Sequence, residues 1–241
     1  EEALLDVARC VLAAKRADRE ASEGLVIGKT NSANTHGVMI CLNCETDFVA
    51  KNADFGAMAD RIATIALEKG AKSVEELKAL PYDSNGLSIA EKIVEQTGVI
   101  GEKLDVSVCE VVDAAFVYAY NHPGNKVVSL VGLNKAGFET AAKDVAMQIA
   151  AMAPVALNKD SVPADVIAKE LEIGKELAIQ EGKPAEMAEK IAAGRLNKFF
   201  KESTLLAQEF IKDNKLSVEQ YLKSQDKDLT AIGFKRHSLM Q

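Results

Sequence analysis

Two cysteines with the spacing of a redox or metal-binding pair are the first residues that could do chemistry. Cys41 and Cys44 are separated by two residues. A redox pair needs a helix N-terminus that lowers the thiol pKa, and a structural zinc site needs two further ligands. Cys41 instead falls in an apolar run of strand length, and the sequence offers no second close pair of cysteine or histidine residues. We therefore interpret all four cysteines, Cys10 and Cys109 included, as small buried hydrophobic residues, and keep a cysteine-based redox or zinc protein as the alternative.

A second candidate is the segment 24–30, Gly-Leu-Val-Ile-Gly-Lys-Thr, which ends like a phosphate-binding loop. That motif has four residues between its glycines, so that backbone N–H groups can surround a phosphate, and it leads into a helix. Here three apolar residues intervene, and a turn-rich segment follows. A nucleotide-binding enzyme is therefore only the third hypothesis.

The three histidines do not indicate a catalytic site. They lie in expected turns or in the C-terminal tail, and none stands in a motif such as GxSxG or HExxH. His122, within the turn-forming segment 121–125, is interpreted as a turn residue rather than a general base. We expect no enzyme, no cofactor and no bound metal, and an interaction protein is the class that remains.

The stretch 43–52, Asn-Cys-Glu-Thr-Asp-Phe-Val-Ala-Lys-Asn, presents an acid beside an aromatic residue. It follows the apolar segment 37–42, which has the length of a strand and is bounded by turn formers. Thr46 or Asp47 can accept backbone N–H bonds as an N-cap. We therefore expect the chain to turn here from a strand into a helix, with a polar and exposed first turn.

Phe48 has two interpretations on pattern alone. It precedes Phe55 by seven residues, which is nearly the same face of one continuous helix and would place it in the core. Asn52 and Asp54, however, look like the start of a second helix, which would break that register. The pattern leaves open whether Phe48 is buried or exposed.

The composition is that of an ordinary globular protein. Of 241 residues 48% are hydrophobic and 27% charged, so the chain can bury a substantial core. The net charge of −7 and the pI of about 5.2 argue against a nucleic-acid partner, which would favour a basic surface. No apolar run approaches the roughly 20 residues of a membrane span, and no signal-peptide pattern occurs. We expect no direct nucleic-acid contact, no membrane contact and a cytoplasmic location.

The hydrophobic periodicity predicts two similar halves, each with a hairpin of strands, a striped helix and a further strand. The first half has strands at 25–30, 37–42 and 103–112 and helices at 54–69, 73–79 and 88–97. The second half has strands at 114–120, 126–133 and 231–235 and helices at 137–152 and 217–223. The apolar stripes of the two long helices align in register, which favours an internal duplication. Their residues are Phe55, Ala59, Ile62 and Ala66 in the first helix and Phe138, Ala142, Val145 and Ile149 in the second.

We therefore predict an α+β fold of two related subdomains, each an antiparallel sheet with packed helices, plus a helical hairpin module. The predicted parts are an N-terminal helix and connector at 1–23, a core N-subdomain at 24–112, the first part of a core C-subdomain at 113–157, the hairpin module at 158–202, and the completion of the C-subdomain with a C-terminal tail at 203–241.

The hairpin module is predicted from two charged helices at 163–181 and 184–200. Pro163 and Pro184 fit the first helical positions, and Gly182 fits the position just after the first helix. One seam is expected to pair Ile167, Leu171, Gly174 and Leu177 with Ala188, Ile191, Ala192 and Phe199. Such a hairpin either packs on its own body or serves as a docking or dimer arm, so a homodimer is left open.

The stretch 43–52 resembles the signature of the bacterial translation elongation factor Ts family. Further blocks that look like those of the family, in the family's order, lie at 17–24, 97–102, 120–122, 145–154 and 194–200. The resemblance covers nearly the whole chain. It implies two related α+β core subdomains, a helical hairpin module and a C-terminal segment.

The resemblance implies a guanine-nucleotide exchange factor rather than an enzyme. Its partner would be elongation factor Tu, both GDP-bound and nucleotide-free, from which it would promote GDP release during translation elongation. In the family, the Phe that corresponds to Phe48 wedges between elements of the GTPase, and its turn disturbs the ligand shell of the Mg²⁺ ion. The family's contact residues carry over to Thr46, Asp47, Phe48 and Val49, with a second partner contact at Met147 and Gln148.

Two features depart from the family's pattern. Some members carry His where this chain has Gln148, and Gln keeps a donor and an acceptor but cannot become an imidazolium. The block Thr-Gly-Ala-Gly-Met-Met-Asp-Cys of the family's N-terminal three-helix domain is absent from the sequence, which opens without Met inside a helical pattern. We interpret the chain as a fragment of a longer protein and expect it to bind the GTPase more weakly than a complete form.

Overall fold

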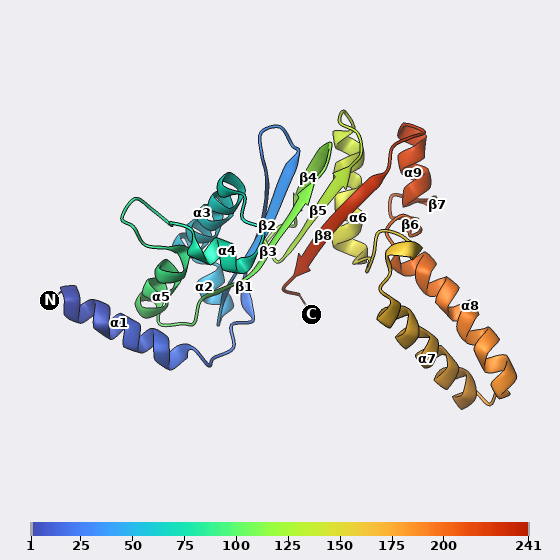
Figure 1. The fold of residues 1–241 in the computed structure, drawn as a ribbon, viewed down its shortest axis with the longest axis horizontal. Coiled ribbons are helices and arrows are strands. Elements are labelled where there is room, and N and C mark those ends of the chain that lie inside the picture. The colour runs from blue at the N-terminus through green and yellow to red at the C-terminus, as the bar shows by residue number, and fades with distance from the viewer. Residues whose placement is uncertain (1, 241) are drawn as a thin grey trace.

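Two three-stranded antiparallel sheets form the centre of the protein (Figure 1). The computed structural model describes residues 2–240. The first sheet has the order β1-β2-β3 and consists of β1 (Glu23–Thr30), β2 (His36–Cys44) and β3 (Asp105–Asp113). The second sheet has the order β4-β5-β8 and consists of β4 (Phe116–Asn121), β5 (Val127–Leu133) and β8 (Ala231–Ser238). Each sheet starts as a hairpin and gains its third strand after helices, as the repeated pattern predicted.

The two sheets pack against each other through one face of each. Because side chains alternate along a strand, β2 contributes to two different clusters. Ile40 and Leu42 point toward the helices of the first half, whereas Met39 and Cys41 point toward the second sheet. The cluster between the sheets consists of Val26, Met39, Cys41, Val112, Val117, Val128 and Leu130. Burial on both faces explains the unbroken apolar run at 37–42.

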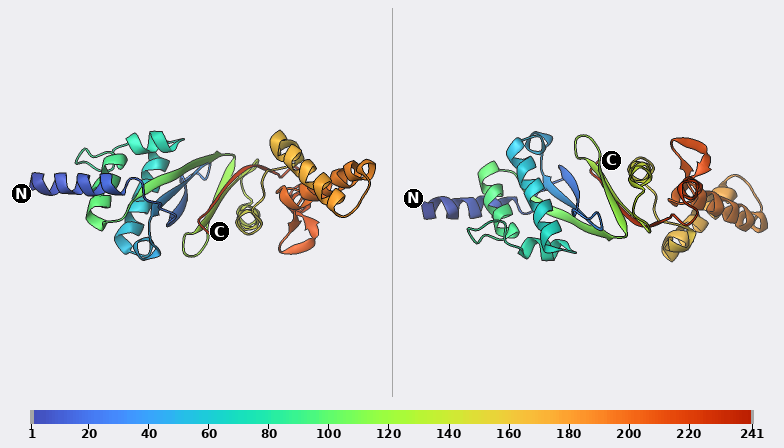
Figure 2. Two further views of the ribbon diagram at one scale, coloured as in Figure 1. Left: turned by 90° about the horizontal axis from the view of Figure 1, so that it is seen from below. Right: turned by 90° about the horizontal axis from the view of Figure 1, so that it is seen from above.

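Helices cover the outer faces of both sheets (Figure 2). α3 (Ala53–Lys69) lies on the first sheet, and α6 (Glu139–Met152) lies on the second. The predicted stripe residues Phe55, Ala59, Ile62, Ala66, Ala142, Val145 and Ile149 are all buried. Phe138 is instead the N-cap residue of α6 and is half-buried. The two halves therefore share both strand order and the placement of their main helix.

The first half also contains α1 (Glu2–Arg16), the single turn α2 (Asp47–Ala50), α4 (Val74–Ala79) and α5 (Ile89–Ile100). α1 lies on α5, so close that a Cβ atom on Gly98 would lie 2.5 Å from the Cβ of Arg9. The prediction of four buried cysteines is wrong at Cys10, which is exposed because α1 is covered on one side only. The other three cysteines are buried.

A helical hairpin, called the arm here, extends away from the sheets (Figure 1). It consists of α7 (Ala164–Gln180) and α8 (Ala185–Ser203), after a short 3-10 helix η1 (Lys159–Ser161). Pro163 and Pro184 are N-cap residues rather than the first residues of the helices, so each helix begins one residue later than predicted. Gly182 has a φ of +78° in the turn between the helices, as expected of a glycine at this position.

The seam of the arm differs from the predicted one in its detail. Gly174 is buried against Ala192, whose Cα would lie 3.1 Å from a Cβ at position 174. Leu177 is 39% exposed, and the neighbouring Ala178 is buried instead. Two helices that approach this closely leave room for small side chains only, so the larger residue points outward.

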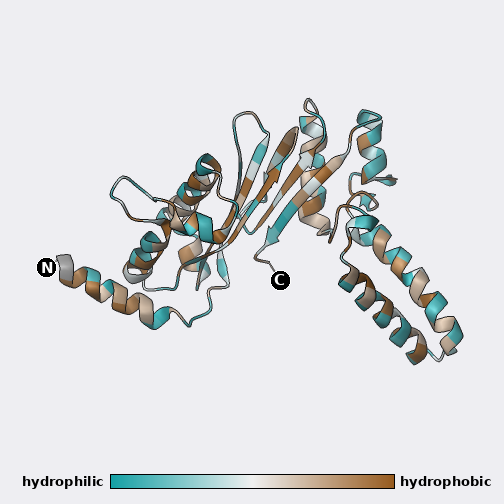
Figure 3. Ribbon diagram, viewed as in Figure 1, coloured by the Kyte–Doolittle hydropathy of each residue, from teal (hydrophilic) through white to brown (hydrophobic). Residues whose placement is uncertain are grey.

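The chain returns from the arm to the second sheet through β6 (Glu209–Phe210), β7 (Asp213–Ser217) and α9 (Val218–Gln225). The β6-β7 hairpin was not predicted, because β6 has only two residues and the five residues of β7 are mostly polar and exposed, so neither strand leaves a periodic apolar signal. Apolar residues concentrate on the central strands, and the end of β8 is polar (Figure 3). The predicted α+β fold class is confirmed, while the division into five parts remains a prediction. Within residues 2–240, no helix is both long and apolar enough to cross a membrane.

Candidate functional site

The cysteine pair at the end of β2 does not form a chemical site. Cys41 and Cys44 belong to different clusters, one between the sheets and one under α3, because they occupy opposite faces of the strand. Burial raises the pKa of Cys41 to about 11 and that of Cys44 to about 12. Across the described part of the chain, no group of three or more His, Cys, Asp or Glu residues could hold a metal ion. The redox or zinc alternative therefore has no structural support.

The turn after β2 presents Phe48 to solvent. α2 (Asp47–Ala50) is a single helical turn with Thr46 as its N-cap residue, and the Val49 N–H group donates to Thr46 Oγ1 at 3.4 Å. Ala50 faces the core, whereas the Phe48 side chain is 83% exposed. The structure thus resolves the question that the pattern left open.

A second N-cap separates Phe48 from the helix that follows. The side chain of Asn52 accepts the N–H group of Asp54 at 2.8 Å and starts α3 there. Phe55 is buried in the core under α3. Because the helix is interrupted between the two aromatic residues, the heptad spacing does not place Phe48 on the buried face.

Asp47 is an exposed carboxylate beside this aromatic residue. Its Oδ2 atom accepts a hydrogen bond from Lys51 Nζ at 2.7 Å, one helical turn later. That bond, together with the positive charge of Lys51, lowers the pKa of Asp47. The turn therefore offers a charged oxygen acceptor and a large apolar surface, which suits contact with a partner.

Glu102, in the loop between α5 and β3, binds the backbone of this turn. Its Oε2 atom accepts the N–H groups of Glu45 and Thr46 at 3.1 and 3.0 Å, and its Oε1 atom accepts the Thr46 hydroxyl at 2.7 Å. In return, Glu45 Oε1 accepts the N–H group of Lys103 at 2.7 Å. This reciprocal pairing is called the Glu45–Glu102 clasp below. Sequence reasoning missed it, although Glu102 ends one of the blocks on which the resemblance depends.

Two arginines connect the Glu45–Glu102 clasp to the N-terminal segment. Arg16 Nη1 and Arg19 Nη1 lie 3.4 and 3.1 Å from the carboxylate of Glu45. The Lys103 N–H bond, and then the arginines, lower the pKa of Glu45. The carboxylate of Glu45 is therefore held ionised between the connector after α1 and the start of β3.

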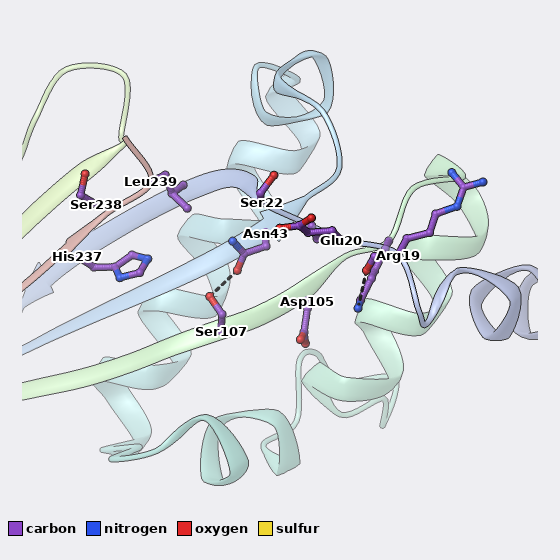
Figure 4. A pocket seen from close by; sticks show the side chains of 11 residues that line it. Arg19, Glu20, Ser22, Asn43, Asp105, Ser107, His237, Ser238 and Leu239 are labelled. Atoms are coloured by element: carbon purple, nitrogen blue, oxygen red, sulfur yellow. Dashed lines mark hydrogen bonds between the residues drawn. The ribbon is translucent and has the colours of Figure 1, made fainter. Parts of the chain in front are cut away.

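An open polar pocket lies beside the clasp (Figure 4). Two of its charged groups are engaged within the protein: Lys103 Nζ donates to the carbonyl oxygens of Ala17 and Arg19, and Asp105 pairs with Lys78 at 2.6 Å. Ser107 Oγ donates to Asn43 Oδ1 at 2.5 Å across the pocket floor. These contacts join strands and connector, and they do not bring a nucleophile and a base together.

Gln148, the second predicted contact, is fully buried in α6. Its Nε2 atom donates to the carbonyl oxygen of Glu209 at 3.0 Å, and its Oε1 atom accepts the N–H group of Ile211 at 2.9 Å. The side chain thus holds the backbone of the β6-β7 turn against α6. Ile211, in that turn, is 45% exposed. Met147, the other predicted residue, is half-buried.

Asp144 supports the same turn one helical turn earlier in α6. It is buried and accepts hydrogen bonds from Lys212 Nζ at 2.5 Å and from the Tyr221 hydroxyl at 2.7 Å. Tyr221 in turn stacks on Phe210, with ring centroids 4.0 Å apart. The β6-β7 turn is therefore held rigidly against α6.

Known proteins resemble this chain along nearly its whole length. A family model described as Elongation factor TS matches residues 45–240. Proteins named Elongation factor Ts are 52% identical in Christiangramia forsetii, 51% in Flavobacterium psychrophilum and 46% in Porphyromonas gingivalis. Each alignment covers 95% of this chain and 82% of the relative.

The repeated α+β units, the exposed aromatic turn and these matches together define a translation elongation factor. Within that class, the chain belongs to the elongation factor Ts family.

Proposed function

We propose that the chain is a guanine-nucleotide exchange factor that binds elongation factor Tu–GDP and promotes GDP release. The observation that carries this proposal is the exposure of Phe48 on a short, capped turn, in a chain of the elongation factor Ts family. A large aromatic side chain that is left in solvent yet held by an ordered backbone suits insertion into a partner. The factor acts by binding and breaks no covalent bond.

The proposed mechanism uses the turn as a wedge. GDP is held in a GTPase by backbone N–H groups of its phosphate loop and by Mg²⁺, which bridges to the phosphate oxygens. Insertion of Phe48 displaces elements of the GTPase beside the Mg²⁺ site, and Thr46, Asp47 and Val49 disturb the ligand shell of the ion. GDP then loses both sets of contacts and dissociates.

Linkage explains how such a factor turns over. A protein that weakens GDP binding is itself bound more weakly when GDP is present, by the same factor. Incoming nucleotide therefore expels the exchange factor from its complex with nucleotide-free elongation factor Tu. One copy of the chain can serve many GTPase molecules.

The second partner contact is proposed at the C-terminal half of α6. Because Gln148 uses its amide within the protein, we propose that it acts through the β6-β7 turn, with Met147 beside it. Ile211 is the apolar residue that this turn exposes. The loss of an imidazolium at position 148 is compatible with this indirect role, which needs one donor and one acceptor.

The remaining partner predictions follow from the proposed function. The net charge of −7 disfavours direct nucleic-acid contact, and translation elongation places the factor in the cytoplasm. The arm exposes Ile179 and Met187, so its role as a docking or dimer arm, and with it a homodimer, stays a prediction.

Release of fluorescent GDP from elongation factor Tu tests the proposal. The chain should accelerate release, and Phe48→Ala should reduce the acceleration at least ~30-fold, because truncation of a central interface aromatic costs about 2 kcal/mol or more. Ile232→Ala, at an apolar residue of β8 that is 49% exposed, is the control and should leave the rate unchanged. No acceleration by the parent chain would refute the proposed function.

A further inference from the structure

We propose that Glu102 is a positioning residue for nucleotide exchange, because it holds the turn that carries Phe48. This inference deepens the proposed function and rests on it. Glu102 itself lies in the loop between α5 and β3, 54 residues after Phe48 in the sequence, and acts on the wedge through the backbone of Glu45 and Thr46.

The need for an acceptor at this place follows from the end of the first sheet. Cys44 is the last residue of β2 that pairs with β1, and Asn43 is the last that pairs with β3. The next two N–H groups, of Glu45 and Thr46, therefore have no strand to bind. A carboxylate that accepts both forms charge-assisted hydrogen bonds, which are about twice as strong as neutral ones.

The Thr46 hydroxyl links Glu102 to the helical turn itself. It donates its proton to Glu102 Oε1 at 2.7 Å, which leaves its lone pairs directed at the N–H group of Val49. Glu102 thereby orients the N-cap side chain of α2 as well as the backbone before it. A helix of four residues is not stable by itself, so its geometry depends on such anchors.

The loop that carries Glu102 is itself built to present the carboxylate. Gly101 ends α5 with a φ of +78°, a conformation that glycine adopts without strain. The next peptide places Lys103 so that its N–H group binds Glu45 at 2.7 Å. The chain segments on both sides of the Glu45–Glu102 clasp are therefore fixed. The Phe48 side chain has little packing of its own, so the backbone of its turn sets its direction.

The test uses Glu102→Gln, which keeps the size of the side chain and replaces one carboxylate oxygen by an amide donor. The first readout is amide hydrogen exchange of the parent chain and the variant, with Glu68→Gln at an exposed position of α3 as the matched control. The N–H groups of Glu45 and Thr46 should exchange at least ~10-fold faster in Glu102→Gln only. Unchanged exchange at both would overturn the proposal.

The second readout is GDP release at varied concentrations of the variant. Glu102→Gln should lower the maximal rate about tenfold and change the half-saturating concentration less than threefold, because docking through the second contact persists. The double variant with Phe48→Ala should be no slower than Phe48→Ala alone, since Glu102 acts through Phe48. The proposal would be overturned if the rate reductions of the two single variants multiplied in the double variant. A parent-like rate in Glu102→Gln would also overturn it.

A second variant and a comparison of outcomes keep the test decisive. Thr46→Val removes the hydroxyl link and keeps both N–H bonds, so it should also lower the maximal rate, and it serves if Glu102→Gln does not fold. A parent-like rate for Thr46→Val would then overturn the proposal. If the parent chain fails to accelerate GDP release, the proposed function fails, whereas the amide exchange rates still decide whether Glu102 holds the turn.

Discussion

At the scale of single residues, Phe48 leaves its apolar surface in solvent, whereas the nearby cysteines bury theirs. Burial of apolar surface contributes about 25 cal/mol per Å², and Phe48 forgoes most of this contribution in the free protein. Cys41 and Cys44, a few residues earlier, gain it by facing two different cores. The stretch 43–52 thus changes within four residues from a buried strand end to a surface made for contact.

The cysteines give a prediction about thiol reactivity. With the pKa of Cys41 and Cys109 at about 11 and that of Cys44 at about 12, on the order of 0.1% or less of each thiol is ionised at pH 8. Iodoacetamide should therefore label one thiol, that of the exposed Cys10, rapidly in the native chain. Mass spectrometry after labelling with and without denaturant checks this, and rapid native labelling at Cys41 or Cys44 would revive the redox hypothesis.

At the scale of elements, the two helices of the arm approach each other closely at Gly174. Gly174 meets the Cα of Ala192, whereas a Cβ at Gly194 in α8 would have nothing within 4 Å. The same substitution at the two glycines therefore separates helix packing from helix propensity. Both glycines lie inside helices, so the propensity effect is similar.

Gly174→Val should destabilise the arm by about 1–3 kcal/mol, because the added methyl groups overlap the backbone of α8. Gly194→Val should change its stability by less than about 0.5 kcal/mol. Amide hydrogen exchange in α7 and α8 measures both effects locally. Equal effects of the two variants would show that the seam does not pass through Gly174.

The last strand, β8, makes stability depend on pH. Burial, and then the positive charge of Arg236, lower the pKa of His237, while Glu110 opposes them weakly. The unfolded chain, with an ordinary histidine pKa near ~6.5, then binds the proton more tightly than the folded chain. Stability should therefore rise with pH from the lowered pKa up to about 6.5 and level off above it.

Urea unfolding at pH 5.5, 6.5 and 7.5 checks this expectation. The midpoint should fall on acidification, and His237→Gln should reduce the fall, because glutamine does not titrate. His122→Gln, in the exposed turn between β4 and β5, is the comparison variant and should retain the parent slope. An unchanged slope in His237→Gln would contradict the expectation.

At the scale of the whole molecule, the side chain of Asn121 adds a direct hydrogen-bonded link between the two sheets, beside the apolar cluster that packs them together. Asn121, at the end of β4, accepts the N–H group of Gly28 at 2.8 Å and donates to its carbonyl oxygen at 3.0 Å. The contact is tight, since a Cβ on Gly28 would lie 2.7 Å from Val128 Cγ1. Asn121 thus binds both backbone groups of a residue in the other sheet, as a neighbouring strand would.

Asn121→Ala should lower the free energy of unfolding by about 1–3 kcal/mol, because two partly buried backbone groups of Gly28 lose their partner. Asn214→Ala, at an exposed residue of β7, should change it by less than about 0.5 kcal/mol. Urea denaturation of the three proteins measures the difference. A loss in Asn121→Ala no larger than in the control would show that the apolar cluster alone holds the sheets together.

The sequence by itself determined the features that depend on near neighbours. Strand alternation, the helical stripes of α3 and α6 and the glycine after α7 could be predicted because burial periodicity and turn chemistry act over a few residues. The repeat of the two halves followed from the same local signals. The resemblance of the stretch 43–52 and later blocks indicated the family, which the matches confirmed.

Only the tertiary structure decided the features that join distant segments. Glu102 binds Thr46 across 56 residues, and Gln148 binds Ile211 across 63. The pairing of such groups depends on which loop ends lie side by side after the sheets have packed, and no local pattern encodes it. Packing likewise left Cys10 and Phe48 exposed, because burial depends on whether another element covers a residue as well as on its type.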